Sequence, residues 1–394
     1  MKTNNNIPAY RFQGYTDAWE LRKLGEVAEI NPKSQIPETF EYVDLESVVG
    51  TSLISHRTVR AEYAPSRAQR LALPGDIFYQ TVRPYQKNNY LFDLSDDNYV
   101  FSTGYAQLRP KIDDRYLMIK IQEDGFVKEV LDRCTGTSYP AINSKDLSQI
   151  SIDVPTSLPE QEAIGTFFST LDRHITLHQR KLDTLKEQKK TYLKLLFPAK
   201  GQTKPALRFQ GFEDDWEEVK LGEVLVEYNK KSEIENQFEL LSSTNSGIEP
   251  RSGRVSGESN IGYKIIKRGM VVLSPQNLWL GNINYNAKFE IGIVSPSYKV
   301  FNINGPNELY LATVLRLPKM FFEYAQASVQ GASIVRRNLD LDLFSSILVQ
   351  LPSLPEQEVI GTFFQNLDQE IAQVEDKLAS LKEMKKTLLR KLFV

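Results

Sequence analysis

The chain of 394 residues contains the same sequence framework twice, and this duplication constrains its fold more than any other feature. Residues 8–30 recur as residues 205–227, 197 positions later, and residues 158–197 recur as residues 354–393, 196 positions later. The segments between these blocks hardly align, although their lengths differ by only one residue. We therefore expect one fold that is present twice and carries two different surfaces.

A few matches persist inside the divergent segments. Gly75 corresponds to Gly269, and each glycine precedes an apolar run typical of a strand. The other matched pairs are Ser102 with Ser295, Tyr105 with Tyr298, Gly136 with Gly331 and Ser138 with Ser333. Trp19 and Trp216 recur with the repeated framework, so we interpret both as core residues. Trp279 has no counterpart and is a candidate contact residue.

The second repeated block predicts a long helix in each copy. Pro159 suits the first turn, glutamates follow it at the positive end of the helix dipole, and lysines gather at the other end. Apolar residues recur alternately four and three positions apart over about five heptads, which indicates a coiled-coil seam. His178 and Lys189 are polar residues within this seam.

Each helix needs a partner for its seam, and the other copy is the obvious one. Because a long segment separates the two helices in sequence, the chain can return and pack them antiparallel. Gly165 and Gly361 each weaken their helix by roughly 1 kcal/mol. We therefore expect close packing of the helix against its own domain at these glycines, with docking of a partner protein as the alternative.

Composition excludes several classes of protein. A single cysteine, Cys134, excludes a disulfide framework and a cysteine-based zinc cluster. No apolar run reaches the ~18–20 residues that span a bilayer, and residues 1–10 lack the apolar core of a signal peptide, so we expect a cytoplasmic protein. The net charge of −2 counts mildly against nucleic-acid binding unless positive charge is clustered locally.

Positive charge is clustered locally in both divergent segments. Residues 54–90 carry a net charge of +4, and so do residues 242–288. Matching excesses of this kind are typical of contact with DNA phosphates. Reading bases requires side chains that fork onto base edges, chiefly Arg on guanine and Asn or Gln on adenine.

The candidate DNA-binding residues follow from these two requirements. In the first segment they are Arg57, Arg60, Arg67, Arg70, Gln80, Arg83, Lys87 and Asn88, with Asn89 beside them. In the second segment they are Asn245, Arg251, Arg254, Gln276, Asn277, Trp279, Asn282, Arg336 and Arg337. A lone arginine or asparagine is more often a solvated surface side chain, so the prediction rests on the clusters.

The repeated framework resembles that of the specificity subunits of type I restriction–modification systems. The resemblance rests on the RFQG and LGEV of the first block, on the LPEQE and FF of the second block, and on the duplication of both. It implies an α+β fold, with two globular target-recognition domains joined by two long antiparallel coiled-coil helices in a pseudo-two-fold tandem repeat. The expected division is a first target-recognition domain at 1–157, a spacer helix at 158–198, a second target-recognition domain at 199–353 and a second spacer helix at 354–394.

The resemblance also implies a function. In that family each target-recognition domain reads one half of a split, asymmetric site in double-stranded DNA. The spacer helices dock methyltransferase subunits, which methylate adenine with S-adenosylmethionine, and restriction (translocase) subunits use ATP and Mg to cut unmodified DNA. This chain is then expected to be non-catalytic and to bind no cofactor or metal itself. A helix of about 38 residues is roughly 57 Å long, somewhat more than one DNA turn.

Two other classes of function remain open from the residues alone. A self-sufficient restriction enzyme needs catalytic motifs, but the sequence has no G-x-x-x-x-G-K-[ST] loop, no G-x-G-x-x-G turn and no Asn/Asp-Pro-Pro-aromatic motif. Glu187-Gln188-Lys189 imitates a nuclease Glu-x-Lys, but it lies within the heptads. A coiled-coil scaffold that binds only protein is the second alternative, and it predicts no salt-dependent affinity for DNA.

A metal site on the first helix is a further possibility. His174 and His178 lie four residues apart and could bind a metal from one helix face. The second copy replaces them with Glu370 and Val374. We therefore interpret His178 as a polar seam residue that sets the helix register.

Overall fold

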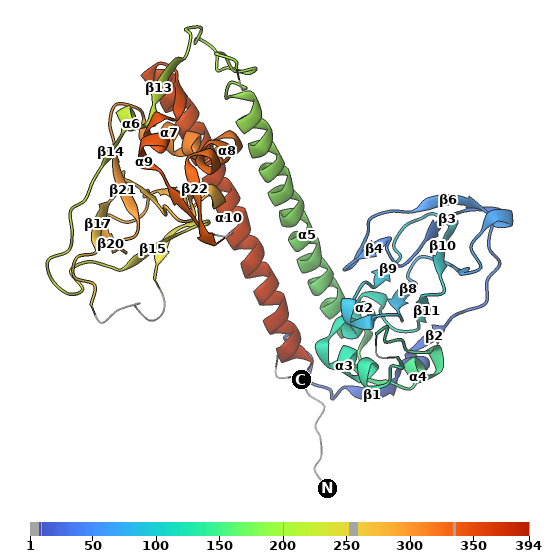
Figure 1. Cartoon of the computed structure of the whole chain (residues 1–394). Helices are drawn as coiled ribbons and strands as arrows, with labels where there is room; N and C mark the ends of the chain where they lie inside the picture. Colours follow the sequence, from blue (N-terminus) through green and yellow to red (C-terminus); the bar gives the residue numbers. More distant parts are fainter. Residues whose placement is uncertain are drawn as a thin grey trace. The chain divides into compact units, whose positions relative to one another are not determined.

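The computed structural model describes residue 8 and residues 10–136, 138–199, 201–251, 259–333 and 336–393, with the backbone alone described for 329–333 and 336. The chain folds into two compact units, which are coloured along the sequence in Figure 1. Unit 1 comprises Met1–Arg180 together with Asp376–Val394, and unit 2 comprises Lys181–Glu375. Each long helix therefore contributes one part to each unit.

The described part of unit 1 is built on two four-stranded sheets and a two-stranded ribbon. The first sheet has the strand order β2-β11-β8-β9, and the second has the order β6-β3-β10-β7. The strands of the first sheet are β2 (Ala28–Ile30), β8 (Ile77–Gln80), β9 (Tyr90–Leu91) and β11 (Tyr105–Pro110). Those of the second are β3 (Thr39–Val43), β6 (Arg57–Arg60), β7 (Ala68–Leu71) and β10 (Tyr99–Ser102). The ribbon pairs β1 (Glu20–Lys23) with β12 (Ser151–Val154), and a small hairpin joins β4 (Val48–Val49) to β5 (Ser52–Leu53).

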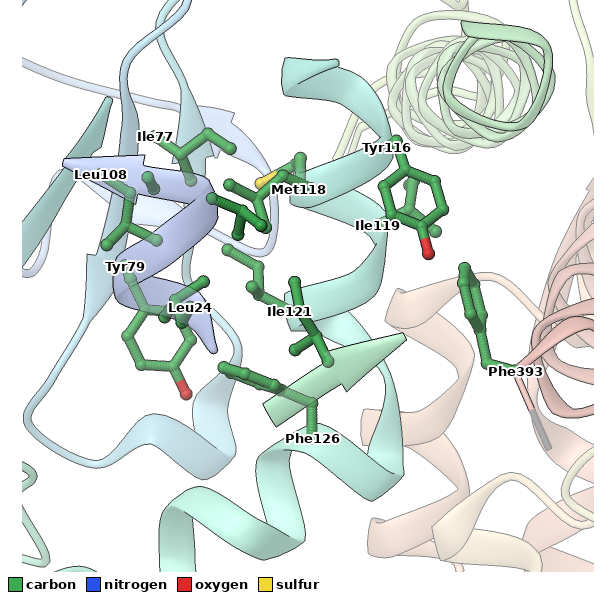
Figure 2. Close-up of a cluster of buried hydrophobic side chains, with 14 of the residues drawn as sticks. Leu24, Ile77, Tyr79, Leu108, Tyr116, Met118, Ile119, Ile121, Phe126 and Phe393 are labelled. Carbon is green, nitrogen blue, oxygen red and sulfur yellow. The ribbon is translucent and has the colours of Figure 1, made fainter. Parts of the chain in front are cut away.

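The main core of unit 1 lies between the first sheet and the helices that follow it. These helices are α1 (Leu24–Val27), α2 (Asp114–Gln122), α3 (Asp124–Asp132) and α4 (Ser144–Ser148). Figure 2 shows Ile77 and Leu108 of the sheet facing Ile121 of α2, with Phe126 of α3 beside Tyr79. All five side chains are buried. Every residue of β8 is buried, so this strand is covered on both faces.

Unit 2 repeats this framework strand for strand. Its first sheet has the order β14-β21-β18-β19, which copies the order β2-β11-β8-β9 of unit 1, and β13 pairs with β24 as β1 pairs with β12. The strands are β13 (Glu217–Lys220), β14 (Leu225–Glu227), β18 (Val271–Leu273), β19 (Ile283–Tyr285), β21 (Lys299–Ile303) and β24 (Leu348–Leu351). The helices are α6 (Leu221–Val224), α7 (Glu308–Leu315), α8 (Pro318–Gln326) and α9 (Leu341–Ser346). The predicted duplication of one α+β fold is confirmed.

The two units differ in the divergent segments. Where unit 1 has the sheet β6-β3-β10-β7, the described part of unit 2 has two strand pairs, β15 (Leu241–Thr244) with β16 (Gly247–Pro250) and β17 (Lys264–Lys267) with β20 (Ile291–Val294). A parallel bridge from Leu240 to Ile293 connects these two pairs. A third pair, β22 (Ser328–Ser333) with β23 (Arg336–Leu339), lies between α8 and α9. Gly75 and Gly269 nevertheless keep equivalent turns, since both have positive φ, +89° and +87°. The matched strand runs after them are β8 and β18, as predicted.

The two long helices are α5 (Leu158–Leu195) and α10 (Leu354–Leu392), close to the predicted bounds. In unit 1 they run antiparallel, and Lys385 of α10 forms an ion pair with Asp172 of α5 at 2.5 Å. In unit 2 the equivalent pair joins Lys189 of α5 to Asp368 of α10, also at 2.5 Å. The seam residue Lys189 of Glu187-Gln188-Lys189 thus has a carboxylate partner on the other helix.

Each unit also receives the end of the helix that begins in the other repeat. In unit 1, Phe393 at the end of α10 packs against Trp19 and Tyr116, with ring centroids 5.9 and 6.0 Å away. Figure 2 shows Phe393 beside Tyr116. In unit 2, Phe197 after α5 packs in the same way against Trp216 and Tyr310, at 6.2 and 5.8 Å. Both tryptophans are buried, at 5% and 4% exposure, so their predicted role in the core is confirmed.

Each long helix begins with a buried ion pair. Glu160 is fully buried, and its carboxylate accepts hydrogen bonds from Nε and Nη2 of Arg11 at 2.7 and 2.8 Å. Glu356 repeats this arrangement with Arg208, at 2.7 Å for both bonds. The neighbouring glutamine Gln161 accepts from the backbone N–H of Asp113 and donates to a carbonyl of the preceding loop. The LPEQE motif therefore ties each helix to its own domain.

The glycines inside the helices mark a close approach, as expected. A Cβ atom on Gly165 would lie 2.6 Å from Oδ1 of Asp113 and 2.7 Å from the backbone nitrogen of Tyr116. A Cβ atom on Gly361 would lie 2.7 Å from the backbone nitrogen of Tyr310. In both units the glycine lets the first turn of α2 or α7 contact the long helix, which confirms packing of helix against domain.

The seam residue His178 has a testable role. Its Nδ1 lies 2.8 Å from the carbonyl oxygen of His174 in its own helix, and no other hydrogen bond of His178 is found among the described residues. A half-buried imidazole in an apolar seam adds little stability, so His178→Val is expected to leave the melting temperature unchanged or raise it. Thermal unfolding followed by circular dichroism measures this, with the exposed His174→Ala as control. A clear drop for His178→Val alone would show that His178 has a specific partner.

Candidate nucleic-acid interface

The first group of predicted residues lies on the second sheet of unit 1. Arg57 and Arg60 belong to its edge strand β6, Arg70 belongs to the other edge strand β7, and Arg67 directly precedes β7. Arg57, Arg60 and Arg67 are exposed. The guanidinium carbon of Arg57 lies 5.2 Å from the ring centroid of Tyr42 on the neighbouring strand. Arg60 forms a loose, exposed ion pair with Glu62 at 3.9 Å, whereas no ion pair of Arg57 or Arg67 is found among the described residues, so their charge is available to a phosphate backbone.

Arg70 differs from the other arginines of this sheet. It is half-buried, and its Nε is buried without a hydrogen-bond partner among the described residues. Burial lowers the pKa of its guanidinium from the usual value. A buried N–H group without an acceptor costs about 1–3 kcal/mol.

The second group of predicted residues of unit 1 lies at the end of β8 and in the loop after it, and some of these residues are buried while others are not. Gln80 and Asn89 are buried, at 2% and 1% exposure. Asn89 Oδ1 accepts from the backbone N–H of Gln80 at 2.8 Å, and Gln80 Nε2 donates to the Val82 carbonyl and to Gln86 at 2.7 and 2.9 Å. Both amides therefore hold the loop in shape, and their contact with bases stays an untested prediction.

Lys87 and Asn88 also have structural partners. Asn88 Oδ1 accepts from the backbone N–H of Gly50 at 2.9 Å. Lys87 donates to the carbonyl of Gln122 at 2.8 Å and forms an ion pair with Asp124 at 2.5 Å. The hydrogen bond from Lys87 lowers the pKa of Asp124, and two cations of α10, Lys386 and Arg390, add to this effect. Arg83 is also half-exposed, and its guanidinium carbon lies 4.6 Å from the ring centroid of Tyr139.

In unit 2, too, some of the predicted residues are buried and others are exposed. Asn282 is buried, accepts from Ser243 Oγ at 2.8 Å and donates to the Ser243 carbonyl at 2.9 Å, so it fixes the β15–β16 hairpin. Asn245, at the tip of that hairpin, is exposed, and so is Gln276. Asn277 and Arg251 are half-exposed. Arg254 lies outside the described residues, and so does the side chain of Arg336, whose backbone belongs to β23.

Trp279 and Arg337 lie together in unit 2. The guanidinium carbon of Arg337 lies 4.9 Å from the ring centroid of Trp279. Trp279 belongs to the short helix η3 (Leu278–Leu280) after β18, and Arg337 belongs to β23. Both are half-exposed, yet Nε1 of Trp279 and Nε of Arg337 are buried without a hydrogen-bond partner among the described residues.

The charge cluster of unit 2 is weaker at its surface than the sequence predicts. Lys264 is buried at 6% exposure, and burial lowers the pKa of its ammonium group. Arg268 forms an ion pair with Glu290 at 3.4 Å. Lys267 and Lys288 remain exposed. The net charge of +4 therefore overstates the cations available to phosphates.

Two contributors to this surface were not predicted from the sequence. Tyr139 is 63% exposed and carries Arg83 on its ring. Arg316 donates to the carbonyls of Ile283 and Asn245 at 3.0 and 3.1 Å, and so holds the hairpin tip in place. The sequence offers one signal for Tyr139, namely that it is an aromatic residue in a divergent segment. No sequence signal marks Arg316.

Neither a metal site nor a membrane-spanning helix is found among the described residues. Among them, no group of three or more His, Cys, Asp or Glu side chains is arranged to hold a metal ion. No helix in the described part of the chain combines the length and the apolar character that crossing a bilayer requires.

Comparison with known proteins identifies the family. A profile described as the type I restriction modification DNA specificity domain matches the chain twice, over residues 16–187 and 213–383. The chain is 24% identical over 331 residues to a Methanocaldococcus jannaschii protein described as the type I restriction enzyme MjaVIII specificity subunit, covering 74% of this chain and 72% of that protein. A solved type I restriction–modification S subunit from M. genitalium has the same fold, with a TM-score of 0.64 at 18% identity over 98% of this chain and 99% of that one. The two matched segments make up most of the sequence, so the chain belongs to the type I restriction–modification DNA specificity family, whose members are non-catalytic subunits with tandem target-recognition domains.

Proposed function

We propose that this chain reads a split, asymmetric site in double-stranded DNA, with the divergent part of each unit reading one half-site. The observation that carries this proposal is the pairing of one repeated framework with two different surfaces. If both units read DNA through the same framework, unlike surfaces lead to unlike half-sites. Exposed arginines in unit 1 and exposed lysines in unit 2 supply the charge for phosphate contact.

The proposal extends to partners and cofactors. The two long helices act as a spacer of roughly 57 Å and as the docking site of methyltransferase subunits, which methylate adenine with S-adenosylmethionine. Restriction subunits that use ATP and Mg join this complex. The chain itself binds none of these cofactors and works in the cytoplasm, where the DNA that it reads is found.

Methylation mapping tests this function. We expect methyladenine to arise at one split, asymmetric motif in a host that carries this chain with its partner methyltransferase subunit. A host that carries the methyltransferase subunit alone is expected to lack that motif. Long-read sequencing of genomic DNA from both hosts measures the difference. A folded complex without any chain-dependent motif would contradict the proposal.

Exchange of one divergent segment tests, in the same experiment, whether each segment determines one half-site. Residues 31–150, replaced with the segment of another family member, are expected to change one half-site and leave the other unchanged. A change in both half-sites would contradict the model of two independent readers. The competing function, a coiled-coil scaffold that binds only protein, predicts no DNA affinity that falls with salt.

A further inference from the structure

Among the described residues, each unit has an arginine that lies over an aromatic ring from a different loop. In unit 1 the guanidinium of Arg83 lies over Tyr139, 4.6 Å from the ring centroid. In unit 2 the guanidinium of Arg337 lies over Trp279, at 4.9 Å. The two pairs occur in the divergent segments, where the sequences of the two repeats hardly align.

The two pairs occupy equivalent places in the repeated fold. Arg83 precedes the short helix η2 (Pro84–Gln86) after β8, and Trp279 lies in η3 after β18, the equivalent strand of unit 2. Tyr139 lies between α3 and α4, and Arg337 lies between α8 and α9. The arginine and the aromatic residue have therefore exchanged loops between the two units. A pairing that persists although its two residues have changed places indicates that the pair itself is required.

The loops that carry the pair are held firmly in unit 1. The backbone N–H of Arg83 donates to the carbonyl of Pro140 at 2.8 Å, and Val82 forms a β-bridge with Ala141. Arg83 adopts the left-handed backbone conformation, with φ of 55° and ψ of 54°. This conformation is uncommon for a residue other than glycine, and residues held in it are concentrated at functional sites. The strain is consistent with a side chain that must point in one direction.

The loops of unit 2 are tied to the helix α8. Phe321 of α8 lies close to Gly281, the residue that ends η3, since a Cβ atom there would be 3.4 Å from its ring. Arg337 donates through Nη1 to the carbonyl of Ala325, also in α8, at 3.3 Å. The Arg337 guanidinium is therefore held by α8 through Nη1 while it lies over Trp279.

An arginine held in this way is suited to one task. The aromatic ring fixes the plane of the guanidinium through cation–π contact and leaves N–H groups at its edge for a ligand. Two N–H groups in one plane match the O6 and N7 acceptors of guanine in the major groove. No hydrogen bond or ion pair of the Arg83 guanidinium is found among the residues that the structure describes.

We propose that Arg83 and Arg337 are specificity residues that each read a guanine in their own half-site, with Tyr139 and Trp279 as positioning residues. This inference rests on the proposed function. Arg57 is not assigned this role although it lies over Tyr42, because those two residues face each other on adjacent strands of one sheet. We assign Arg57 to phosphate contact, which carries no base preference.

The test uses the complex of this chain with its partner methyltransferase subunit and a library of randomised DNA duplexes. The bound or methylated duplexes are sequenced to obtain the base preference at each position. For the wild-type chain we expect a G:C requirement in each half-site. Arg83→Ala is expected to reduce discrimination at one G:C position of one half-site roughly tenfold to a hundredfold, and Arg337→Ala is expected to do so in the other half-site.

Conservative variants separate base reading from a structural role. Arg83→Lys keeps the positive charge but loses the fork, so it is expected to relax the same G:C position as Arg83→Ala. Tyr139→Phe keeps the ring and is expected to retain the base preference, whereas Tyr139→Ala is expected to weaken it at that same position. If Arg83→Ala fails to assemble, Arg83→Lys and the two Tyr139 variants decide the question.

Arg57→Ala is the matched control, since it also removes an arginine that lies over a tyrosine. It is expected to weaken binding to all duplexes alike and to reduce the salt slope by about 1. The inference is overturned if Arg83→Ala and Arg83→Lys behave in this uniform way, or if the wild-type half-sites contain no G:C requirement. A wild-type complex that selects no split motif overturns the proposed function itself, which is a separate result.

Discussion

Arg11→Ala is expected to lower the free energy of unfolding by about 3–5 kcal/mol, the largest effect we expect from a single substitution in this chain. Removing the guanidinium leaves the carboxylate of Glu160 fully buried, with the indole N–H of Trp19 at 3.3 Å as its one remaining side-chain donor among the described residues. A buried charge without its partner is far more costly than the ion pair is favourable. Chemical denaturation of the full chain at neutral pH measures the loss.

The repeat and the surface of unit 1 supply controls for this prediction. Arg208→Ala is expected to have a comparable effect, because Arg208 donates two bonds to the fully buried Glu356. Arg22→Ala removes ion pairs with Glu20 and Glu26 that are exposed to solvent, and it is expected to have little effect on stability because water screens these pairs. If Arg11→Ala costs no more than Arg22→Ala, the pair does not hold the helix to its domain.

Gly165→Ala is expected to destabilise the chain by about 1–3 kcal/mol, although helix propensity alone predicts the opposite sign. Alanine in place of glycine within a helix is normally stabilising by about 0.5–1 kcal/mol. At Gly165, however, the added methyl group would lie 2.7 Å from both Cβ of Arg115 and the backbone nitrogen of Tyr116. Backbone atoms cannot move away as the end of a flexible side chain can, so α2 must shift from α5. Thermal and chemical unfolding both measure the sign.

Gly125→Ala is the matched control in the same unit. Gly125 lies in the first turn of α3, and the nearest atom to an added Cβ is the carboxylate oxygen of Glu123 at 3.0 Å. The Glu123 carboxylate holds Lys120 at 2.7 Å, but it is the end of a flexible side chain and needs to move only slightly, so Gly125→Ala is expected to be close to neutral. Gly361→Ala should behave like Gly165→Ala, because it meets the backbone nitrogen of Tyr310 at 2.7 Å. Stabilisation by Gly165→Ala would contradict the close approach.

Much of the framework is predictable because its signals are local or repeated. The bounds of α5 and α10 follow from the heptads and from the proline and charges at their ends, all of which act within a few residues. Trp19 and Trp216 are predictable as core residues because they recur with the framework. Gly165 and Gly361 are predictable as points of close packing because glycine is costly inside a helix unless something needs the space.

The partners of the buried polar groups are not predictable in this way. Arg11 and Glu160 are 149 positions apart, and no local pattern in the sequence connects them. Their joint recurrence as Arg208 and Glu356 is the one signal that could have suggested the pair. The same holds for the cross-helix partner of Lys189, because a heptad pattern identifies a seam residue but not the residue that faces it.

Sequence by itself determined the duplication, the two long helices with their seam and the family, and it predicted the segments in which recognition residues are expected to lie. Only the tertiary structure decided which polar side chains of those segments face outwards. Gln80 and Asn282 had the same composition signal as exposed candidates, but the structure buries both. The partner of Asn282 and the pairing of Arg83 with Tyr139 come from segments that are distant in sequence, whereas Gln80 is held by residues of its own loop. A loop side chain is buried when other parts of the folded chain pack over it. The residues next to it in sequence do not determine which parts those are.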